Sequence, residues 1–329
     1  MPVGVCAFAK INIGLKIGSR RADGFHPLRT VYQTITLHDR VRVDLARGTG
    51  VEIRCKDQRV PDDESNTCWR IAERVMKALK VRGRVVIHVE KTLPVQGGMG
   101  GASSNAIATL LALERLLGQQ LAPEERLRIA AEVGSDLPLF LIGGTVLGLG
   151  RGEEVYPLPD LPELNCVVAT SEIAVSTSQA FADWDSQEQE KYGKGQAAGR
   201  LTATTASDKL SGFSRAVFAW LGGSSTGVPA KGSGDRAEAL LLDLVRAGIE
   251  NDFENVVFPQ HPELRSVKRA LEREGAAYAS LSGSGSSVYG LFKSADSAKT
   301  AANRLNAEGI SAVATKTLTK REYWKKIWA

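Results

Sequence analysis

Residues 94–104 read Pro-Val-Gln-Gly-Gly-Met-Gly-Gly-Ala-Ser-Ser, and this stretch decides the fold. An apolar run over 85–89 predicts a strand before it, and apolar residues at helical spacing over 106–117 predict a helix after it. Glycines let backbone N–H groups turn toward a ligand, and the start of a helix adds unpaired donors and a partial positive charge. A tight turn alone needs fewer glycines and serines, so the stretch predicts a phosphate-binding loop whose helix is opened by Ser103, Ser104 and Asn105.

Two common nucleotide-binding motifs do not match this loop. No Gly-Lys-Ser/Thr follows the glycines, as a Walker A loop requires, and the spacing is not the G-x-G-x-x-G of dinucleotide-binding proteins. A nucleotide at this loop is therefore bound by another architecture.

The composition is that of a soluble globular protein. The 329 residues predict roughly two domains, and 43% hydrophobic with 24% charged residues exclude extended disorder. The apolar stretch 137–150 is too short to cross a bilayer, and Lys10 and Asn12 interrupt the segment where a signal peptide would be apolar, so we expect a cytoplasmic protein. A net charge of +5 suits phosphate-bearing ligands but lacks the dense basic block of a nucleic-acid binder.

The chain divides near residue 160. Residues 1–160 form the predicted first domain, with strands over 3–17 and 30–45, helices over 68–79 and 123–133, and a turn at Asp136. Residues 161–329 form the second, in which helices and strands also alternate; strands are expected over 165–169, 278–281, 287–292 and 310–315, and helices over 264–273 and 295–306. Hydrophobic density falls over 183–235, which predicts loops around a helix over 207–221, as part of a polar insertion near 184–240.

The cysteines and histidines do not predict a metal site. The cysteines show no C-x-x-C spacing and the histidines no H-E-x-x-H spacing, so we expect buried, reduced thiols and no tightly bound transition metal.

Lys10, Asp136 and His26 each have an ordinary interpretation when taken singly. Lys10 interrupts an apolar strand, where an ammonium is costly unless it reaches an anion, but a lone lysine more often extends to solvent at a sheet edge. Asp136 before Leu-Pro is most simply a turn residue, and His26 a loop histidine. Spacing alone does not connect the three.

Two further segments remain ambiguous on local chemistry. Residues 282–287, Ser-Gly-Ser-Gly-Ser-Ser, lie between two predicted strands and fit a hairpin or a ligand loop equally well. The basic, aromatic segment 320–328 could contact a membrane or nucleic acid, although such an ending more often packs its tryptophans on the domain.

Four motifs in this order resemble the GHMP kinases. Ala9-Lys-Ile-Asn12 with Arg21-Ala-Asp-Gly-Phe-His26 looks like the opening motif of the branch that acts on a cytidyl substrate, and residues 94–104 look like the ATP loop. Gly134-Ser-Asp-Leu-Pro138 looks like the catalytic aspartate motif, and Leu281-Ser-Gly-Ser-Gly285 like the third motif. The resemblance is good over 1–155, fair over 245–292, and absent or weak in the insertion and the tail.

The resemblance implies the two-domain α+β GHMP kinase fold, with an N-terminal domain similar to ribosomal protein S5 domain 2 and a ferredoxin-like C-terminal domain. It implies an ATP-dependent kinase that phosphorylates the 2-hydroxyl of 4-diphosphocytidyl-2-C-methyl-D-erythritol in the non-mevalonate route to isoprenoid precursors. The implied cofactors are ATP and Mg²⁺, and no macromolecular partner is implied. Oligomeric state is not addressed by the sequence.

The resemblance also implies residue roles. Lys10 and Asp136 become a catalytic pair, in which a carboxylate takes the proton of the attacking hydroxyl and an adjacent ammonium keeps that carboxylate ionised. The implied ATP-binding residues are Asn66, Pro94, Val95, Gln96, Gly97, Gly98, Met99, Gly100, Gly101, Ala102, Ser103 and Ser104. The implied substrate-binding residues are Asn12, Phe25, His26, Thr177, Phe181, Gly283 and Gly285, with Phe25 and Phe181 enclosing the cytidine ring and His26 at its edge. No residue is assigned as a metal ligand.

Two rival functions fit the same motifs. One is another GHMP kinase that acts on a sugar, homoserine or mevalonate, and the other is a non-catalytic ligand sensor on the GHMP scaffold. Lys10 and Asp136 argue against the sensor, because binding alone needs no such pair.

Overall fold

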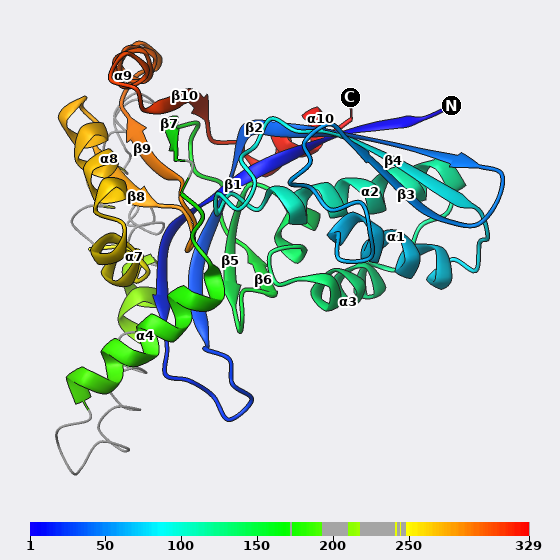
Figure 1. Ribbon diagram of the computed structural model, residues 1–329, viewed down its shortest axis with the longest axis horizontal. Helices are drawn as coiled ribbons and strands as arrows, with labels where there is room; N and C mark the ends of the chain where they lie inside the picture. Colours follow the sequence, from blue (N-terminus) through cyan, green and yellow to red (C-terminus); the bar gives the residue numbers. More distant parts are fainter. Residues whose placement is uncertain (172, 193–209, 218–240, 242–243, 245–247, 329) are drawn as a thin grey trace, which may run out of the picture.

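Two sheets, each covered by helices, make up the molecule in the computed structural model, which describes residues 1–171, 173–192, 210–217, 241, 244 and 248–328 (Figure 1). The long antiparallel strands β1 (Val3–Ile17) and β2 (Leu28–Ala46) run from the first half of the molecule into the second. The predicted α+β architecture is confirmed.

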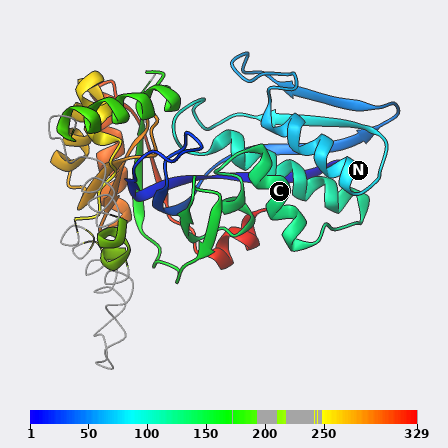
Figure 2. The same cartoon turned by 90° about the horizontal axis from the view of Figure 1, so that it is seen from below.

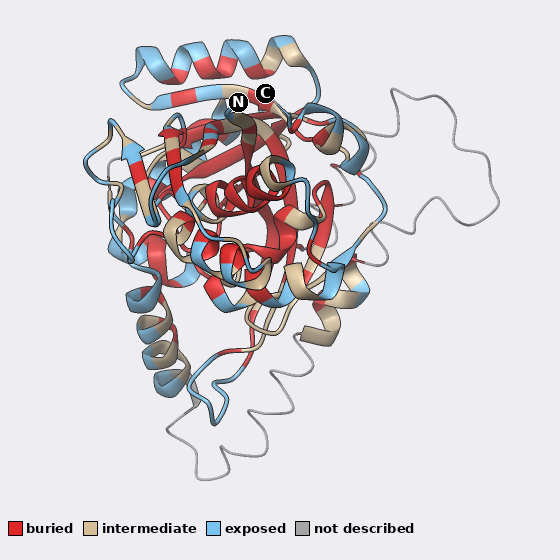
Figure 3. Ribbon diagram, turned by 90° about the vertical axis from the view of Figure 1, so that its right-hand side faces the viewer, coloured by how far each residue is buried: buried red, intermediate tan, exposed pale blue. Residues whose placement is uncertain are grey.

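The first sheet has six strands. Its order is β3 (Gly50–Cys55), β4 (Arg84–Glu90), β2, β5 (Thr145–Leu149) and β6 (Glu154–Pro157), and β1 pairs with β2 beside this path. Helices α1 (Thr67–Ala78), α2 (Gly101–Leu117) and α3 (Pro123–Val133), with a 3₁₀ turn at Pro138–Leu141, share a core with it. Figure 3 shows buried residues concentrated in the central helix and strands, while outer helices expose one face to solvent.

The second sheet is antiparallel in the order β10 (Ser311–Lys316), β7 (Asn165–Thr170), β9 (Val288–Phe292) and β8 (Tyr278–Leu281). Strands β7 and β8 are separated by helices, β8 and β9 form a hairpin, and one helix precedes β10, which is the ferredoxin-like arrangement. The described helices of this half are α4 (Thr177–Tyr192), α7 (Glu254–Gln260), α8 (Pro262–Arg273) and α9 (Ala295–Ala307).

An apolar core joins the two sheets. Ile11 and Ile35 of the first sheet share it with Val168 and Leu291 of the second, and all four side chains are buried. This continuous burial fixes the two halves against each other and so fixes any site between them. Figure 2, a view from below, shows β1 and β2 extending into the second half of the molecule.

Two local predictions were wrong. Helix α2 begins at Gly101 rather than Ala106, and its N-cap is Gly100 in the left-handed conformation (φ 68°), so the serines lie inside the first turn instead of capping it. Residues 183–192 were expected to be loops, but they continue α4, whose buried Ala180 and Trp184 lie one turn apart.

The expected helix over 207–221 is helical at 210–217, and its other residues, with most of the polar insertion, lie outside the described residues. Cys68 and Cys166 are buried as expected, whereas Cys6 and Cys55 are half-buried, and all four are free thiols. Among the described helices, none combines the length and the apolar character that crossing a bilayer requires.

The C-terminal segment packs on the first half of the molecule. Helix α10 (Lys320–Lys326) buries Tyr323, whose hydroxyl donates to Phe140 O (2.7 Å), and the Trp324 indole N–H donates to Ile142 O (2.9 Å). The tail therefore uses its aromatic residues for packing. The domain boundary near residue 160 stays a prediction.

Candidate active site

Lys10 and Asp136 meet between the two halves. Lys10 Nζ lies 3.5 Å from Asp136 Oδ2, although one residue is on β1 and the other on the turn after α3. Lys10 is only 3% exposed, while the Asp136 side chain is 32% exposed. A buried ammonium therefore faces a carboxylate that substrate can reach.

The strand geometry of β1 directs Lys10 and Asn12 to the same side. Side chains two residues apart share one face of a strand, and the pairing with β2 shifts register on both sides of this segment. Lys10 Nζ donates to Asn12 Oδ1 (2.7 Å) and to Gly98 O (2.7 Å), and Asn12 Nδ2 donates to Thr30 Oγ1 (2.8 Å). Burial lowers the pKa of Lys10, and the negative charge of Asp136 opposes this shift.

The glycine loop, residues 94–101, has a backbone that side chains would obstruct. A Cβ on Gly100 would lie 2.9 Å from the Phe140 ring and 3.1 Å from Lys10 Cγ. Gln96 also has a positive φ of 61°, which is uncommon for a residue with a side chain. The loop therefore brings its backbone against Lys10 just before the N-terminus of α2.

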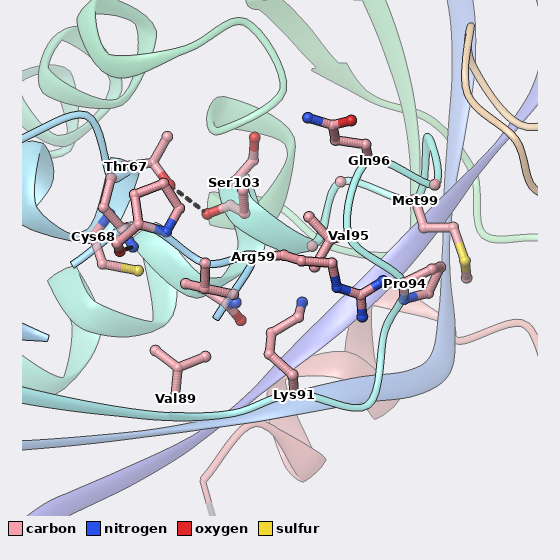
Figure 4. A pocket seen from close by; sticks show the side chains of 18 of the residues that line it. Arg59, Thr67, Cys68, Val89, Lys91, Pro94, Val95, Gln96, Met99 and Ser103 are labelled. Atoms are coloured by element: carbon pink, nitrogen blue, oxygen red, sulfur yellow. Dashed lines mark hydrogen bonds between the residues drawn. The ribbon is translucent and has the colours of Figure 1, made fainter. Parts of the chain in front are cut away.

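A pocket of about 360 Å³ opens on one side of the glycine loop. The side chains of Arg59 and Lys91 extend into it, opposite Thr67 at the start of α1 (Figure 4). Lys91 Nζ is held by the buried carboxylate of Asp39, which also accepts from the backbone N–H groups of residues 92 and 93. Two cations and an N-terminal helix turn thus surround a space suited to a nucleotide with phosphates.

A second pocket of about 630 Å³ lies on the other side and is lined by both halves of the molecule. It contains Lys10 and Asp136, and it shares Gly98, Gly100 and Ser103 with the first pocket. The two pockets therefore meet at the glycine loop, beside the Lys10–Asp136 pair.

Most of the sequence-predicted residues line these pockets. The first pocket contains Asn66 and the whole run from Pro94 through Val95, Gln96, Gly97, Gly98, Met99, Gly100, Gly101 and Ala102 to Ser103. The second contains Asn12, Phe25, His26, Thr177, Phe181 and Gly283.

Three of the predicted residues either use their polar groups in bonds elsewhere or lie outside both pockets. Asn66 caps α1, because its Oδ1 accepts from Cys68 N (2.8 Å) and its Nδ2 donates to Pro61 O (2.6 Å). Ser104 is buried at 2% exposure and lines neither pocket. Gly285 also lies behind the surface of both pockets, with its backbone packed against Gly98.

The second glycine loop, residues 282–287, both closes the β8–β9 hairpin and supports the first glycine loop. Ser282 Oγ donates to Gly98 O (3.0 Å), and Ser287 N donates to Gly97 O (3.1 Å). A Cβ on Gly283 would lie 3.4 Å from Lys10 Nζ, so this loop reaches the Lys10–Asp136 pair from the second half. The hairpin interpretation of the segment is confirmed, and the ligand-loop interpretation stays a prediction.

The aromatic arrangement in the second pocket differs from the expected one. Phe181 stacks on His26, with ring centroids 5.3 Å apart and planes at 10°, whereas Phe25 is 49% exposed and lies under the Arg151 guanidinium (4.8 Å). His26 Nδ1 bonds Gly18 O (2.9 Å), which leaves Nε2 as the ring nitrogen nearest α4.

Sequence reasoning missed several residues at this site. Tyr32 OH donates to Asp136 Oδ1 (3.1 Å), and burial together with the Asp136 charge raises the pKa of Tyr32 well above its ordinary value. Arg151 and Asp185 line the second pocket, and Lys91 lines the first. Asp185 could have been found from its four-residue spacing after Thr177 and Phe181, but a tyrosine in an apolar strand gives no such signal.

The described residues offer Mg²⁺ no site made of protein ligands alone. No group of three or more histidine, cysteine, aspartate or glutamate side chains converges in that part of the chain. Mg²⁺ commonly keeps several waters and binds through substrate phosphates with few protein ligands, so an ion bound in that way would not need such a group.

Comparison with known proteins agrees with this geometry. Family models match at residues 66–144, described as GHMP kinases N terminal domain, and at 236–311, described as GHMP kinases C terminal. The fold is shared with a homoserine kinase from Cytophaga hutchinsonii ATCC 33406, at a TM-score of 0.65 and 21% identity over 97% of this chain and 95% of that one. The protein is a GHMP kinase.

Full-length relatives narrow the assignment. The chain is 36% identical over 322 residues to the 4-diphosphocytidyl-2-C-methyl-D-erythritol kinase of Solibacter usitatus (strain Ellin6076), covering 98% of this chain and 90% of that protein. It is 34% identical to the enzyme of that name from Moorella thermoacetica, covering 95% and 98%. A crystal structure of 4-(cytidine 5'-diphospho)-2C-methyl-D-erythritol kinase matches at a TM-score of 0.69 with 28% identity, over 95% of this chain and 98% of that one. The chain belongs to the family of 4-diphosphocytidyl-2-C-methyl-D-erythritol kinases.

Proposed function

We propose that the protein transfers the γ-phosphoryl group of ATP to the 2-hydroxyl of 4-diphosphocytidyl-2-C-methyl-D-erythritol, in the cytoplasm and in the non-mevalonate route to isoprenoid precursors. Its relatives carry the name of this activity over nearly the full chain. The observation that carries the proposal is the meeting of two pockets at the glycine loop, beside Lys10 and Asp136.

The first pocket is the proposed ATP site. Its glycine loop could not carry side chains at Gly98 or Gly100 without contacts under 3 Å, and such bare backbone beside a helix N-terminus is what bound phosphates require. Lys91 and Arg59, which are ion-paired with Asp39 and Asp57, bring N–H donors to the same pocket, and such donors suit the phosphates. Mg²⁺ bound with ATP would neutralise charge developing on those phosphates, and Ser103, which lines both pockets, is the α2 residue that would help to hold it.

The second pocket is the proposed site of the alcohol substrate. Asn12 and Lys10 lie at its inner end, where the methylerythritol hydroxyl must approach, while His26, Phe181 and Phe25 lie toward the cytidine end. Arg20 and Arg151 line the same pocket, and their charges suit a substrate that carries a diphosphate.

The chemistry follows from the placement of the pair. Asp136 accepts the proton of the 2-hydroxyl as that oxygen forms a bond to the γ-phosphorus, and the bond from that phosphorus to the bridging oxygen of ATP breaks to release ADP. Lys10, fixed by Asn12 and Gly98, places a positive charge beside both the carboxylate and the transferring group. Both residues lie where the pockets meet.

The test is a coupled assay of ADP release with ATP and each candidate alcohol. Turnover is expected with the cytidyl substrate, and Asp136→Asn is expected to lower kcat by about 10²- to 10⁴-fold, the usual contribution of a general base. ATP binding should be retained in this variant. Asp160→Asn is the matched control, because Asp160 accepts from Lys320 N outside both pockets.

Two results would refute the proposal. Equal or faster turnover of homoserine or mevalonate would favour another GHMP kinase activity, and full activity of Asp136→Asn would remove the assigned base.

A further inference from the structure

Asp185 lies at the cytidine end of the second pocket, and no role has so far been assigned to it. Thr177, Phe181 and Asp185 follow one another at four-residue spacing on α4, and all three line this pocket. One face of α4 thus carries a hydroxyl, an aromatic ring and a carboxylate into the space where a base would lie.

The two oxygens of Asp185 have different surroundings. Oδ2 lies 3.6 Å from Arg20 Nη1, and Oδ1 lies 3.1 Å from His26 Nε2. Its side chain is 33% exposed and His26 is buried. Arg20 therefore faces one oxygen, and the other lies within hydrogen-bond distance of His26 Nε2 and has a second lone pair for a further donor.

A carboxylate at this place distinguishes two pyrimidines. An ionised carboxylate only accepts hydrogen bonds. The exocyclic 4-amino group of cytosine donates, whereas the 4-oxo group of uracil accepts and would face the carboxylate with a second lone pair. A base that stacked on Phe181, with its edge toward His26, would direct its 4-position substituent toward α4. The next turn of that helix after Phe181 carries Asp185.

We propose that Asp185 is a specificity-determining residue that accepts a hydrogen bond from the 4-amino group of the cytosine ring and thereby excludes uridine-containing substrates. The inference rests on the proposed function, because it takes the cytidyl diphosphate as the substrate of this pocket. Arg20 orients the carboxylate, and Phe181 supplies the stacking surface.

The experiment compares kcat/KM for the cytidine and uridine diphosphate forms of methylerythritol, at saturating ATP. In the wild type the cytidine form is expected to be preferred. Asp185→Asn can present either an N–H or a carbonyl, so the preference should fall by about tenfold or more, with the KM for ATP unchanged. A purely structural role of Asp185 would lower kcat/KM equally for both substrates and leave the cytidine-to-uridine ratio unchanged.

Asp183→Asn is the matched control. It makes the same chemical change two residues away on α4, where Asp183 accepts from Gln179 and Gln260 outside the pocket. Its cytidine-to-uridine ratio should stay at the wild-type value, and circular dichroism of both variants reports their folding.

The outcomes separate the two proposals. A wild type that uses the cytidine form, together with an Asp185→Asn ratio equal to that of the wild type, overturns the assignment of Asp185 alone. A wild type that turns over neither form overturns the proposed function, and this inference with it.

Discussion

Gly98→Ala is expected to damage both folding and catalysis, because the two glycine loops are interlocked at Gly98. Its φ is +76°, and a Cβ would lie 2.1 Å from Ser282 O and 3.0 Å from the Cα and N of Gly285. All three are backbone atoms, so no change of rotamer relieves the contact. One of the two loops must move.

The magnitude follows from two costs. A left-handed conformation costs a residue with a Cβ about 1–2 kcal/mol, and overpacking costs about 1–3 kcal/mol more, so the free energy of unfolding should fall by about 2–5 kcal/mol. Gly98 O also accepts from Lys10 Nζ, so movement of the loop displaces a partner of the ammonium that we propose to be catalytic. Since a misplacement of about 1 Å can cost 10²-fold, kcat is expected to fall by at least about tenfold.

The assay is urea unfolding followed by circular dichroism, together with kcat in the ADP-release assay. Gly118→Ala is the matched control: its φ is +62°, and nothing lies within 4 Å of the added Cβ, so it carries the conformational cost alone. Gly285→Ala should behave like Gly98→Ala, since its Cβ would lie 2.3 Å from Gly98 N. If Gly98→Ala and Gly118→Ala lost equal stability and both kept full activity, the interlocking of the loops would be refuted.

Three further predictions concern the rest of the molecule. Tyr32→Phe removes the donor to Asp136 Oδ1, so kcat should fall by about tenfold in the ADP-release assay. Tyr278→Phe, which loses a bond to a backbone carbonyl elsewhere, should leave kcat unchanged. Burial raises the pKa of Cys68 to about 12, so the folded state keeps a proton that the unfolded state releases near pH 9. In urea under reducing conditions, this contribution to the free energy of unfolding should be fully present below pH 9 and should fall toward pH 12 by up to about 1.4 kcal/mol per pH unit for each such group. A free energy of unfolding that stays constant from pH 8 to 11 would contradict this. Lys10 acts in the opposite sense, but more of the described groups have a raised pKa, namely Cys68, Cys166, Tyr32, Tyr278, Tyr289 and Tyr323. Deleting residues 320–329 removes a buried tyrosine and two hydrogen bonds to the first half, which should cost about 3–5 kcal/mol in the same urea assay, and unchanged unfolding would show that the tail is dispensable.

The glycine loop was the part of the site that local sequence chemistry could predict. Its glycines and the helix after it stand next to one another in the chain, so their joint geometry is a short-range matter. The start of α2 was placed too late, because serines are good N-caps and Gly100 took that position instead. A glycine in the left-handed conformation can end the loop and begin the helix without a side-chain cap.

The convergence of Lys10 and Asp136 came only from the family resemblance. Each residue alone fits an ordinary surface or turn position, and their contact depends on β1 crossing under the glycine loop. The role of Tyr32 could not be predicted from the resemblance either. Tyr32 is one residue of an apolar strand, and its hydroxyl reaches Asp136 only through tertiary packing. Two glycines leave room for this side chain: a Cβ on Gly148 would lie 2.4 Å from the Tyr32 ring, and a Cβ on Gly152 would lie 2.4 Å from its hydroxyl oxygen.

The helix over 177–192 was not predicted, and the reason is compositional. Its sequence is rich in glutamine, glutamate and serine, and such low hydrophobic density is also typical of loops. Ala180 and Trp184 are buried one turn apart on one side of the helix, and Gln187 Nε2 donates to Asn255 O near the start of α7. Packing of one narrow face is therefore what stabilises α4 as a helix.

The second half of the molecule does more than supply one wall of the substrate pocket. Asn251 Nδ2 donates to Leu281 O (2.9 Å) and Gly283 O (2.7 Å), which fixes the second glycine loop at the end of β8. That loop donates to Gly98 O through Ser282, and the same carbonyl accepts from Lys10. Because one carbonyl oxygen has two lone pairs, both bonds can form together, and each restrains the other's donor. The position of the Lys10 ammonium thus depends on a loop from the far half of the chain, so the two halves together build the site around Lys10 and Asp136.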